Sequence, residues 1–358
     1  MLPCVLRLEV AELVHKKNQR KFFARRDERA HFGKTMSSLL STPPSAVSAG
    51  EKSQSTFKAC EIIAAPYAPF KADGSVNLGA IAPYAESLLN QGVSGVFICG
   101  TTGEGASLTT PERKEVAETW MKASGSRLDV IVHTGHNSLD EAVDLGRHAE
   151  SIGADGISAL APSFFKPAND DQLIACCVKM AAAAPSLPFY YYHLPSMTGT
   201  DFPVSRWMSQ AAREIPNFRG VKFTYENLAD FQQCMELEGG RFKCYFGRDE
   251  LFLDGLKIGA KAAVGSTYNY AARLYLSIDR AYADSNLAEA ERLQKIACSF
   301  IDVMIGFGFF GAAKALMQYA GVDCGAPRLP LAPLPKEKTS ALLSALEATG
   351  VLEFVPKG

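Results

Sequence analysis

The 358-residue sequence has almost no net charge, because its 37 basic residues are matched by 38 acidic ones. This balance argues against a nucleic-acid groove and against an anionic membrane surface as partners. The chain has no stretch of about 18 or more apolar residues, so it predicts no transmembrane helix. With 47% apolar residues, it can nevertheless bury a large core. The composition therefore predicts a chain with a large core and with no nucleic-acid or membrane partner.

The cysteines and histidines lack the spacing of a disulfide or metal framework. The nine cysteines are an odd number, no C-x-x-C pair occurs, and Cys176 and Cys177 are adjacent. Buried thiols in a reducing compartment are therefore the favoured interpretation. His133 and His136 lie close in sequence, but no third ligand is evident. We interpret them as loop histidines and predict no metal.

Residues 1–57 differ in composition from the rest of the chain and are predicted to form an N-terminal extension. Basic residues cluster before residue 33, and the stretch 37–55 is rich in Ser, Pro, Gly and Ala, which is typical of a linker. An organelle transit peptide is one interpretation, although Glu9 and Glu12 are unusual in such a peptide. A true start at Met36 is another.

From residue 58 onward, short apolar runs rich in β-branched residues alternate with helix signals. The candidate strands are residues 62–63, 95–99, 130–132, 156–160, 189–192, 220–223, 244–246 and 262–264. Strands that alternate with helices form a parallel sheet, and eight such units predict closure into a (β/α)8 TIM barrel over residues 58–270. A doubly wound open sheet is the alternative, but no G-x-G-x-x-G motif follows the first run.

Helix signals are clearest after the second run and after the barrel. Thr109 and Glu112 have the spacing of a capping box and predict a helix start there. Residues 271–358 carry helical patterns alone, interrupted by the proline-rich stretch 327–335. We interpret this region as additional C-terminal helices packed on the barrel.

Lys222 lies where a barrel of this kind places its active site, at the C-terminal end of a strand. Because strand side chains alternate, Val221 and Phe223 are predicted to face the helices, while Lys222 and Thr224 face the barrel axis. Burial would lower the pKa of the lysine and make it a usable amine nucleophile. The other interpretation is a lysine whose amine reaches solvent from the strand end.

Tyr192 ends the aromatic run 189–192 and shares a strand face with Tyr190. A phenol at the open end of the barrel can move a proton at carbonyl and hydroxyl oxygens. An aromatic strand packed as core is the alternative interpretation.

Three strand-end loops carry small or polar residues. Residues 100–105 read GTTGEG, and their backbone N–H groups and hydroxyls could hold a small anion such as a carboxylate. The loop is not a P-loop, because no Lys-Ser/Thr pair follows the glycines. Asp249 and Glu250 follow the seventh run, and GST at 265–267 follows the eighth. These groups suit a polyhydroxylated ligand, although solvated loop residues would give the same pattern.

Together these segments resemble the dihydrodipicolinate synthase/N-acetylneuraminate lyase family of class I aldolases, from about residue 58 to residue 355. Four motifs in order carry the resemblance: GTTGE at 100–104, YHLPSMTG at 192–199, GVKFT at 220–224 and GSTYNY at 265–270. The resemblance implies a TIM barrel, a small-molecule substrate, a Schiff base on pyruvate and no metal or organic cofactor. Relatives are usually homotetramers, and we expect a cytoplasmic location.

The resemblance also assigns roles to individual residues. Lys222 matches the Schiff-base lysine, and Tyr192 matches the tyrosine acid/base. Thr101 and Thr102 match the pair that binds the pyruvate carboxylate. The chain resembles the lyase branch most, and there the residues around the hydroxylated tail of the sugar acid match Thr224, Gly247, Asp249, Glu250, Gly265 and Ser266.

Met197 departs from the synthase branch, which carries an arginine at this position to bind a second carboxylate. Without that guanidinium, a dicarboxylic product loses a bidentate partner. The lyase branch implies cleavage of N-acetylneuraminate to N-acetylmannosamine and pyruvate. Three alternatives are an aldolase for 2-keto-3-deoxy sugar acids or 4-hydroxy-2-oxoglutarate, the synthase itself, and a catalytically silent barrel that binds sugar acids. We assign no role to Arg248.

Overall fold

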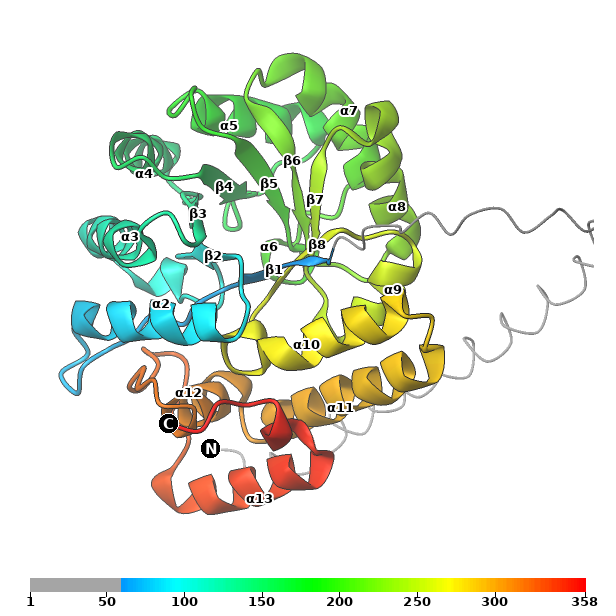
Figure 1. Cartoon of the computed structure of the whole chain (residues 1–358). Helices are drawn as coiled ribbons and strands as arrows, with labels where there is room; N and C mark the ends of the chain where they lie inside the picture. The colour runs from blue at the N-terminus through cyan, green and yellow to red at the C-terminus, as the bar shows by residue number, and fades with distance from the viewer. Residues whose placement is uncertain (1–58) are drawn as a thin grey trace, which may run out of the picture. The chain divides into compact units, whose positions relative to one another are not determined.

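The computed structural model describes residues 59–358, so the predicted N-terminal extension lies outside the described residues. Its centre is a closed parallel barrel in which each strand pairs with the next and β8 pairs with β1 (Figure 1). The strands are β1 (Glu61–Ala64), β2 (Gly95–Ile98), β3 (Asp129–His133), β4 (Gly156–Leu160), β5 (Phe189–His193), β6 (Phe218–Phe223), β7 (Lys243–Phe246) and β8 (Ala262–Gly265). The predicted TIM barrel and its eight strands are therefore confirmed.

Helices follow the strands and cover the outside of the barrel (Figure 1). They are α2 (Ile81–Asn90), α3 (Thr110–Ser124), α4 (Leu139–Ser151), α5 (Asp170–Ala181), α6 (Pro195–Thr198), α7 (Val204–Glu214), α8 (Leu228–Glu236), α9 (Phe252–Lys257) and α10 (Tyr268–Ala283). The capping box at α3 is confirmed, since the Thr109 hydroxyl accepts from the Glu112 N–H and the Glu112 carboxylate accepts from the Thr109 N–H.

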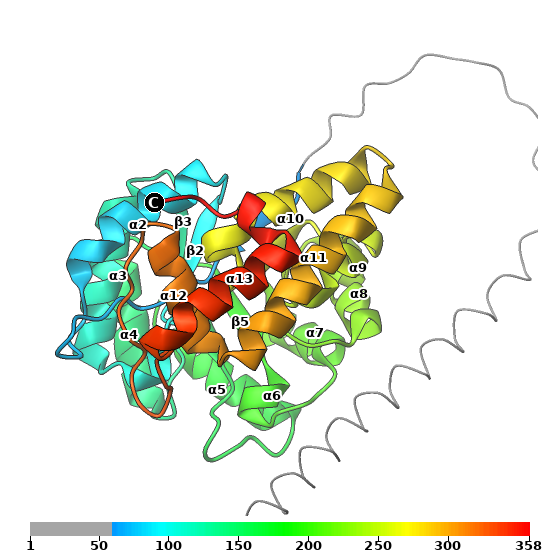
Figure 2. The ribbon, with the colours of Figure 1, turned by 90° about the horizontal axis from the view of Figure 1, so that it is seen from below.

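Three further α-helices follow α10: α11 (Leu287–Gly306), α12 (Phe309–Tyr319) and α13 (Thr339–Thr349). Here α11 packs against α10, α12 and α13, and Figure 2 shows these orange and red helices lying together on one side of the barrel. The predicted boundary between residues 270 and 271 falls inside α10, which packs on β1, β8 and α9. No single helix within residues 59–358 is long and apolar enough to cross a membrane, and α11 with α12 meets that test only as a pair bent by 115°.

Strand alternation divides the core into two parts. Outward-facing residues such as Val221 and Phe223 pack with the helices in one large cluster. Inward-facing residues such as Phe97, Tyr190 and Tyr192 form a second, smaller cluster inside the barrel. The polar side chains that reach the C-terminal end of this inner cluster form the candidate site.

Candidate active site

Lys222 points into the barrel, as the alternation of β6 predicts. The side chain is only 4% exposed, and its Nζ lies 3.9 Å from the centroid of the Phe97 ring and 4.1 Å from that of the Tyr192 ring. Burial lowers the pKa of this amine to about 7, against a weaker opposing effect of Asp249. A large fraction of the amine is therefore uncharged near neutral pH, which is the form that attacks a carbonyl carbon.

Tyr192 lies directly beside Lys222, because β5 and β6 pair these two residues in register. Its hydroxyl is 3.4 Å from the Thr101 Oγ1, and its ring contacts Phe97 edge to face. Burial raises the pKa of the phenol, although hydrogen bonds from Thr101 and Thr224 oppose the shift. The phenol is therefore protonated at rest and stands next to the amine, where it can give or take a proton.

His133 is not the loop histidine that we predicted from sequence. It is the last residue of β3, is buried, and packs edge to face against Tyr192. Its Nε2 accepts the Leu160 N–H, and burial holds the pKa of the imidazole well below its usual value. His133 is thus a neutral ring that supports the phenol. His136 is exposed, and no metal-binding group of three or more ligands occurs within residues 59–358.

Thr101 and Thr102 lie in the turn after β2 and are half-buried. The turn is fixed by Glu104, which has left-handed backbone angles (φ 50°, ψ 31°) and a fully buried carboxylate. That carboxylate lies 2.8 Å from the Nζ of Lys314 on α12, whose side chain is also buried. Lys314 donates to the Ala68 carbonyl as well. Because both charges are buried and paired, the position of the turn depends on α12.

Arg328 fastens the same turn from the proline-rich stretch 327–335. Its backbone N–H donates to the Glu104 Oε2 at 2.8 Å. Its guanidinium pairs with the Glu112 carboxylate and donates to the Gly74 and Ser107 carbonyls. Two elements that follow the barrel in sequence therefore hold the loop that is predicted to bind pyruvate.

Asp249 lies on the opposite side of Lys222, in the short turn after β7. Its side chain is buried, and its Oδ2 accepts the Thr267 hydroxyl at 2.6 Å and the Thr267 N–H at 3.2 Å. Its Oδ1 is buried with no hydrogen-bond partner among the described residues. Burial raises the pKa of this carboxyl to about 6, so it is mostly ionised at pH 7. The unpaired oxygen is an acceptor for which a ligand hydroxyl is the natural partner.

The other predicted tail-binding residues gather around Asp249. Thr224, Glu250 and Ser266 are half-buried, and the Thr224 hydroxyl lies within reach of the Tyr192 phenol. Glu250 lies 3.5 Å from Arg248, so the structure gives Arg248 a role in pairing with Glu250. The structure thus brings the predicted residues together in two groups, with Thr101 and Thr102 on one side of Lys222 and the acidic and hydroxyl groups on the other.

Gly247 and Gly265 are positions where neighbouring side-chain oxygens come so close to the backbone that only glycine fits. A Cβ on Gly247 would lie 2.1 Å from the Thr224 Oγ1, and a Cβ on Gly265 would lie 2.3 Å from the Asp249 Oδ1. Real Cβ atoms do not approach other atoms so closely, so any side chain at either position would displace its polar neighbour. The two glycines therefore act by making room for Thr224 and Asp249.

Replacing Gly265 by Ala is expected to destabilise the fold by about 1–3 kcal/mol, because the new methyl group overlaps Asp249 and the Tyr268 ring. Denaturant unfolding measures this change. A matched control is Gly306→Ala at the end of α11, where no described atom outside the adjoining residues and the helix's own backbone lies within 4 Å of the position that the new methyl group takes. Equal stability of the two variants would contradict the proposed overlap.

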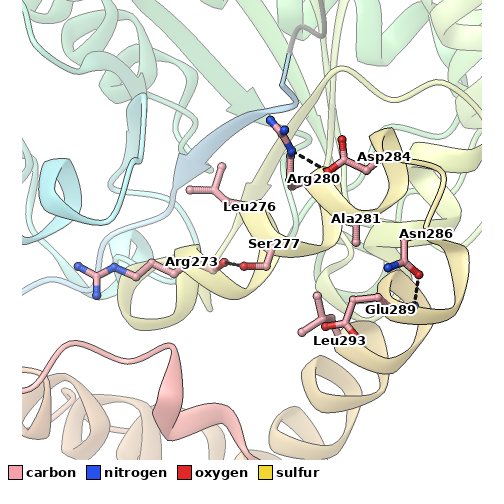
Figure 3. A pocket seen from close by; sticks show the side chains of 9 residues that line it. All are labelled: Arg273, Leu276, Ser277, Arg280, Ala281, Asp284, Asn286, Glu289 and Leu293. Carbon is pink, nitrogen blue, oxygen red and sulfur yellow. Dashed lines mark hydrogen bonds and ion pairs between the residues drawn. The ribbon is translucent and has the colours of Figure 1, made fainter.

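Two hollows lie near or beyond this site. A cavity of 360 Å³ opens beside Thr101 at the ends of β2 to β5, and Met197, 64% exposed, lines its edge. A hollow of 550 Å³ lies between α10 and α11 and is lined by Arg273, Arg280 and Glu289 among others (Figure 3). The first cavity is lined by Thr101 and by His133, which packs against Tyr192, whereas no residue of the candidate site lines the second hollow, so the candidate site is the barrel mouth.

Several residues of the site were not found from the sequence. Phe97, Thr267 and Lys314 contact Lys222, Asp249 and Glu104, respectively. Phe97 could have been inferred from its position on the inner face of β2. Thr267 lies in the GST run that the sequence singled out, but its pairing with Asp249 was not foreseen, and Lys314 lies in a helical pattern that carries no local sign of a polar partner.

Comparison with known proteins places the chain among barrel aldolases. Residues 58–349 match the model of the Dihydrodipicolinate synthetase family. The N-acetylneuraminate lyase of Gallus gallus is 43% identical over 292 residues, which cover 80% of this chain and 95% of the relative. Among solved structures, Proteus mirabilis N-acetylneuraminate lyase is 41% identical with a TM-score of 0.80, and the match covers 82% of this chain and 100% of that chain. A catalytic lysine mutant of Ruminococcus gnavus sialic acid aldolase is 27% identical with a TM-score of 0.78, over 83% of this chain and 98% of that chain.

Proposed function

The chain belongs to the dihydrodipicolinate synthetase family, and on that basis we propose that it cleaves N-acetylneuraminate into N-acetylmannosamine and pyruvate through an imine at Lys222. One observation carries the proposal. An amine with its pKa lowered to about 7 is buried against a phenol at the mouth of the barrel. Relatives about 40% identical that are named N-acetylneuraminate lyase support the choice of substrate.

Imine formation uses the amine and the phenol in turn. The uncharged Nζ of Lys222 attacks the C2 carbonyl carbon of the open-chain sugar acid. Tyr192, protonated because burial raises its pKa, gives its proton to the departing hydroxyl, which leaves as water. The products of this step are a protonated imine and a phenolate held next to each other, so their charges stabilise one another.

The phenolate then removes the proton of the C4 hydroxyl. The C3–C4 bond breaks, its electron pair moves toward the imine nitrogen, and the new C4 carbonyl leaves as N-acetylmannosamine. The remaining enamine takes the proton back from Tyr192 at C3, and hydrolysis of the imine returns pyruvate and free Lys222. Atoms and charges balance without a metal or an organic cofactor.

Binding of the two ends of the substrate falls to the two groups of residues described above. Thr101 and Thr102 are proposed to hold the carboxylate, and Asp249 with Glu250, Thr224 and Ser266 the hydroxylated tail. The synthase alternative lacks support at Met197, where a thioether stands at the edge of the cavity and offers no cation for a second carboxylate. We further propose a homotetramer and a cytoplasmic location, for which the family resemblance is the support.

A substrate panel tests the proposal. Pyruvate release, coupled to lactate dehydrogenase, is expected to be fastest with N-acetylneuraminate when compared with 2-keto-3-deoxygluconate and 4-hydroxy-2-oxoglutarate. Condensation of pyruvate with aspartate semialdehyde is expected to be negligible. Faster turnover of either rival acid, or rapid condensation, would show that N-acetylneuraminate is not the preferred substrate.

The pH dependence of kcat/KM follows from the two shifted groups. Because the pKa of Lys222 is lowered to about 7, the reactive amine becomes scarce as pH falls below 7, and kcat/KM is expected to fall with it. Asp249, with a pKa raised to about 6, titrates in the same pH range. The fall of kcat/KM at acid pH therefore reports Lys222 and Asp249 together. A profile measured from about pH 5.5 to about pH 9 is expected to reach its plateau above about pH 8.

A variant separates the two contributions. Asp249 raises the pKa of Lys222, so Asp249→Asn is expected to move the midpoint of the acid limb to lower pH. A wild-type midpoint above about pH 9 would show that the amine is not desolvated as the structure indicates.

A further inference from the structure

The turn that carries Asp249 and Glu250 is held by side chains from α11, chiefly Gln294. The Nε2 of Gln294 donates to the backbone carbonyl oxygens of Asp249 and Glu250, each at 3.2 Å. The Oε1 of the same amide accepts the Leu253 N–H at 2.9 Å. One turn further along α11, the Cys298 Sγ donates to the Glu250 carbonyl at 3.4 Å. A single amide therefore fastens both ends of the turn that leads from β7 into α9.

An amide is the chemical group that this position requires. The Leu253 N–H lies in the first turn of α9, where helix geometry provides no acceptor. The Asp249 carbonyl already accepts the Phe252 N–H, and the Glu250 carbonyl accepts the Cys298 thiol, so Gln294 adds a second donor to each. Glutamine supplies a donor and an acceptor from one planar group. Glutamate of the same length can only accept when ionised, and methionine can do neither to a comparable degree.

The fastened turn is anchored on its far side by Asp249 alone. The carboxylate of Asp249 is tied to Thr267 through its Oδ2, and its Oδ1 lies buried beside Gly265 and the Tyr268 ring. Glu250 is half-buried and forms an ion pair with Arg248 at 3.5 Å, which lies in the same loop. Since Gln294 is the side chain that joins both backbone carbonyls to the Leu253 N–H, loss of the amide would let the turn and its two carboxylates shift together.

The reacting groups make no hydrogen bond to this clamp, and Asp249 acts on Lys222 only through its charge. Lys222 lies on β6 and Tyr192 on β5, and their neighbours Phe97 and Thr101 belong to β2 and the turn after it. The hydrogen bonds of the Gln294 side chain go instead to the Asp249–Leu253 turn and to Cys298. Damage to the clamp should therefore weaken recognition of the substrate tail and leave pyruvate chemistry intact.

We propose that Gln294 is a positioning residue that sets the affinity of the site for the hydroxylated tail of the substrate. The inference rests on the proposed function, because it takes Asp249 and Glu250 to be the residues that bind that tail. It adds a residue of α11 to the determinants of specificity, although α11 lies outside the β/α repeat and supplies no group to the reacting atoms.

The test compares Gln294→Met and Gln294→Glu with wild type. We expect KM for N-acetylneuraminate to rise about tenfold in both, which corresponds to roughly the net contribution of one hydrogen bond, with kcat within about threefold of wild type. Pyruvate alone, trapped on Lys222 by borohydride, is expected to show the same concentration dependence in all three proteins. Gln232→Met, an exposed glutamine on α8 paired with Glu236, is the matched control and is expected to leave every value unchanged.

Each outcome decides the inference. An unchanged KM in the Gln294 variants would overturn the inference, because the amide would then have no effect on substrate affinity. A loss of pyruvate trapping as large as the rise in KM would also overturn it, because the substitution would then have damaged the whole site. If wild type traps pyruvate but does not cleave N-acetylneuraminate, the proposed function fails. The clamp is then judged by KM for whichever sugar acid of the panel wild type does cleave.

Discussion

Replacing Lys222 by Met is expected to lower kcat by at least about 10⁴-fold, because no other lysine within residues 59–358 lies against Phe97 and Tyr192 to form the imine. Pyruvate release from N-acetylneuraminate measures the loss. Borohydride in the presence of pyruvate is expected to add one reduced pyruvyl group to wild type, located on Lys222 by peptide mapping, and none to the variant. A tag on a different lysine would refute the assignment.

The stability of the Lys222→Met variant can also be predicted. A lysine whose pKa is lowered in the folded state weakens folding at any pH below its ordinary pKa, because the folded chain binds the proton less tightly than the unfolded chain does. For Lys222 that penalty is complete below about pH 7 and disappears only as pH rises to the ordinary lysine value near 10.5. The Met variant is therefore expected to have a Tm at about pH 6 at least equal to that of wild type, so the Tm distinguishes loss of the nucleophile from loss of folding.

Replacing Tyr192 by Phe is expected to reduce kcat by about 10²–10⁴-fold, the usual contribution of a positioned acid/base. The change removes only the hydroxyl that lies 3.4 Å from the Thr101 Oγ1, while the ring and its contacts with Phe97 and His133 remain. Because the amine of Lys222 is untouched, trapping of pyruvate by borohydride is expected to persist, though more slowly. Steady-state kinetics and trapping together distinguish proton transfer from nucleophilic attack.

Tyr190 offers a matched control on the same strand. It faces the barrel interior two residues earlier, and its ring packs edge to face on Tyr245. Tyr190→Phe is expected to keep kcat within a few-fold of wild type. Equal losses in the two variants would mean that phenol removal disturbs the barrel core and that Tyr192 has no separate chemical role.

The barrel and its reacting pair could be predicted because both depend on local rules. Strand alternation alone puts Lys222 and Tyr192 on inward faces, and the order of strands in a barrel makes β5 and β6 neighbours. The same reasoning places Thr101 at the mouth, since the turn after β2 opens on that end. These positions need no knowledge of side-chain packing.

Other parts of the site depend on contacts between residues far apart in sequence. Gln294 reaches the Asp249 turn across 45 positions, and Lys314 reaches Ala68 across 246. Each lies on an amphipathic helix, where a polar residue usually faces solvent, so its burial and its partner follow only from how the helices pack. The prediction for His133 was wrong for a related reason, because the sequence shows where β3 lies but not that its last residue lies within the barrel core.

The pairing of Glu104 with Lys314 has a consequence for dividing the chain. A protein shortened to end after α10 would keep all eight strands and both reacting side chains, yet it would lose Lys314 and the Arg328 N–H, the two groups that pair with the Glu104 carboxylate. Breaking a buried ion pair on one side costs about 3–5 kcal/mol, a large share of the roughly 5–15 kcal/mol that stabilises an ordinary domain, and the shortened chain would also expose the turn after β2. The minimal autonomous catalyst is therefore longer than the minimal barrel, and its final helices are inseparable from the pocket for the acid group of pyruvate.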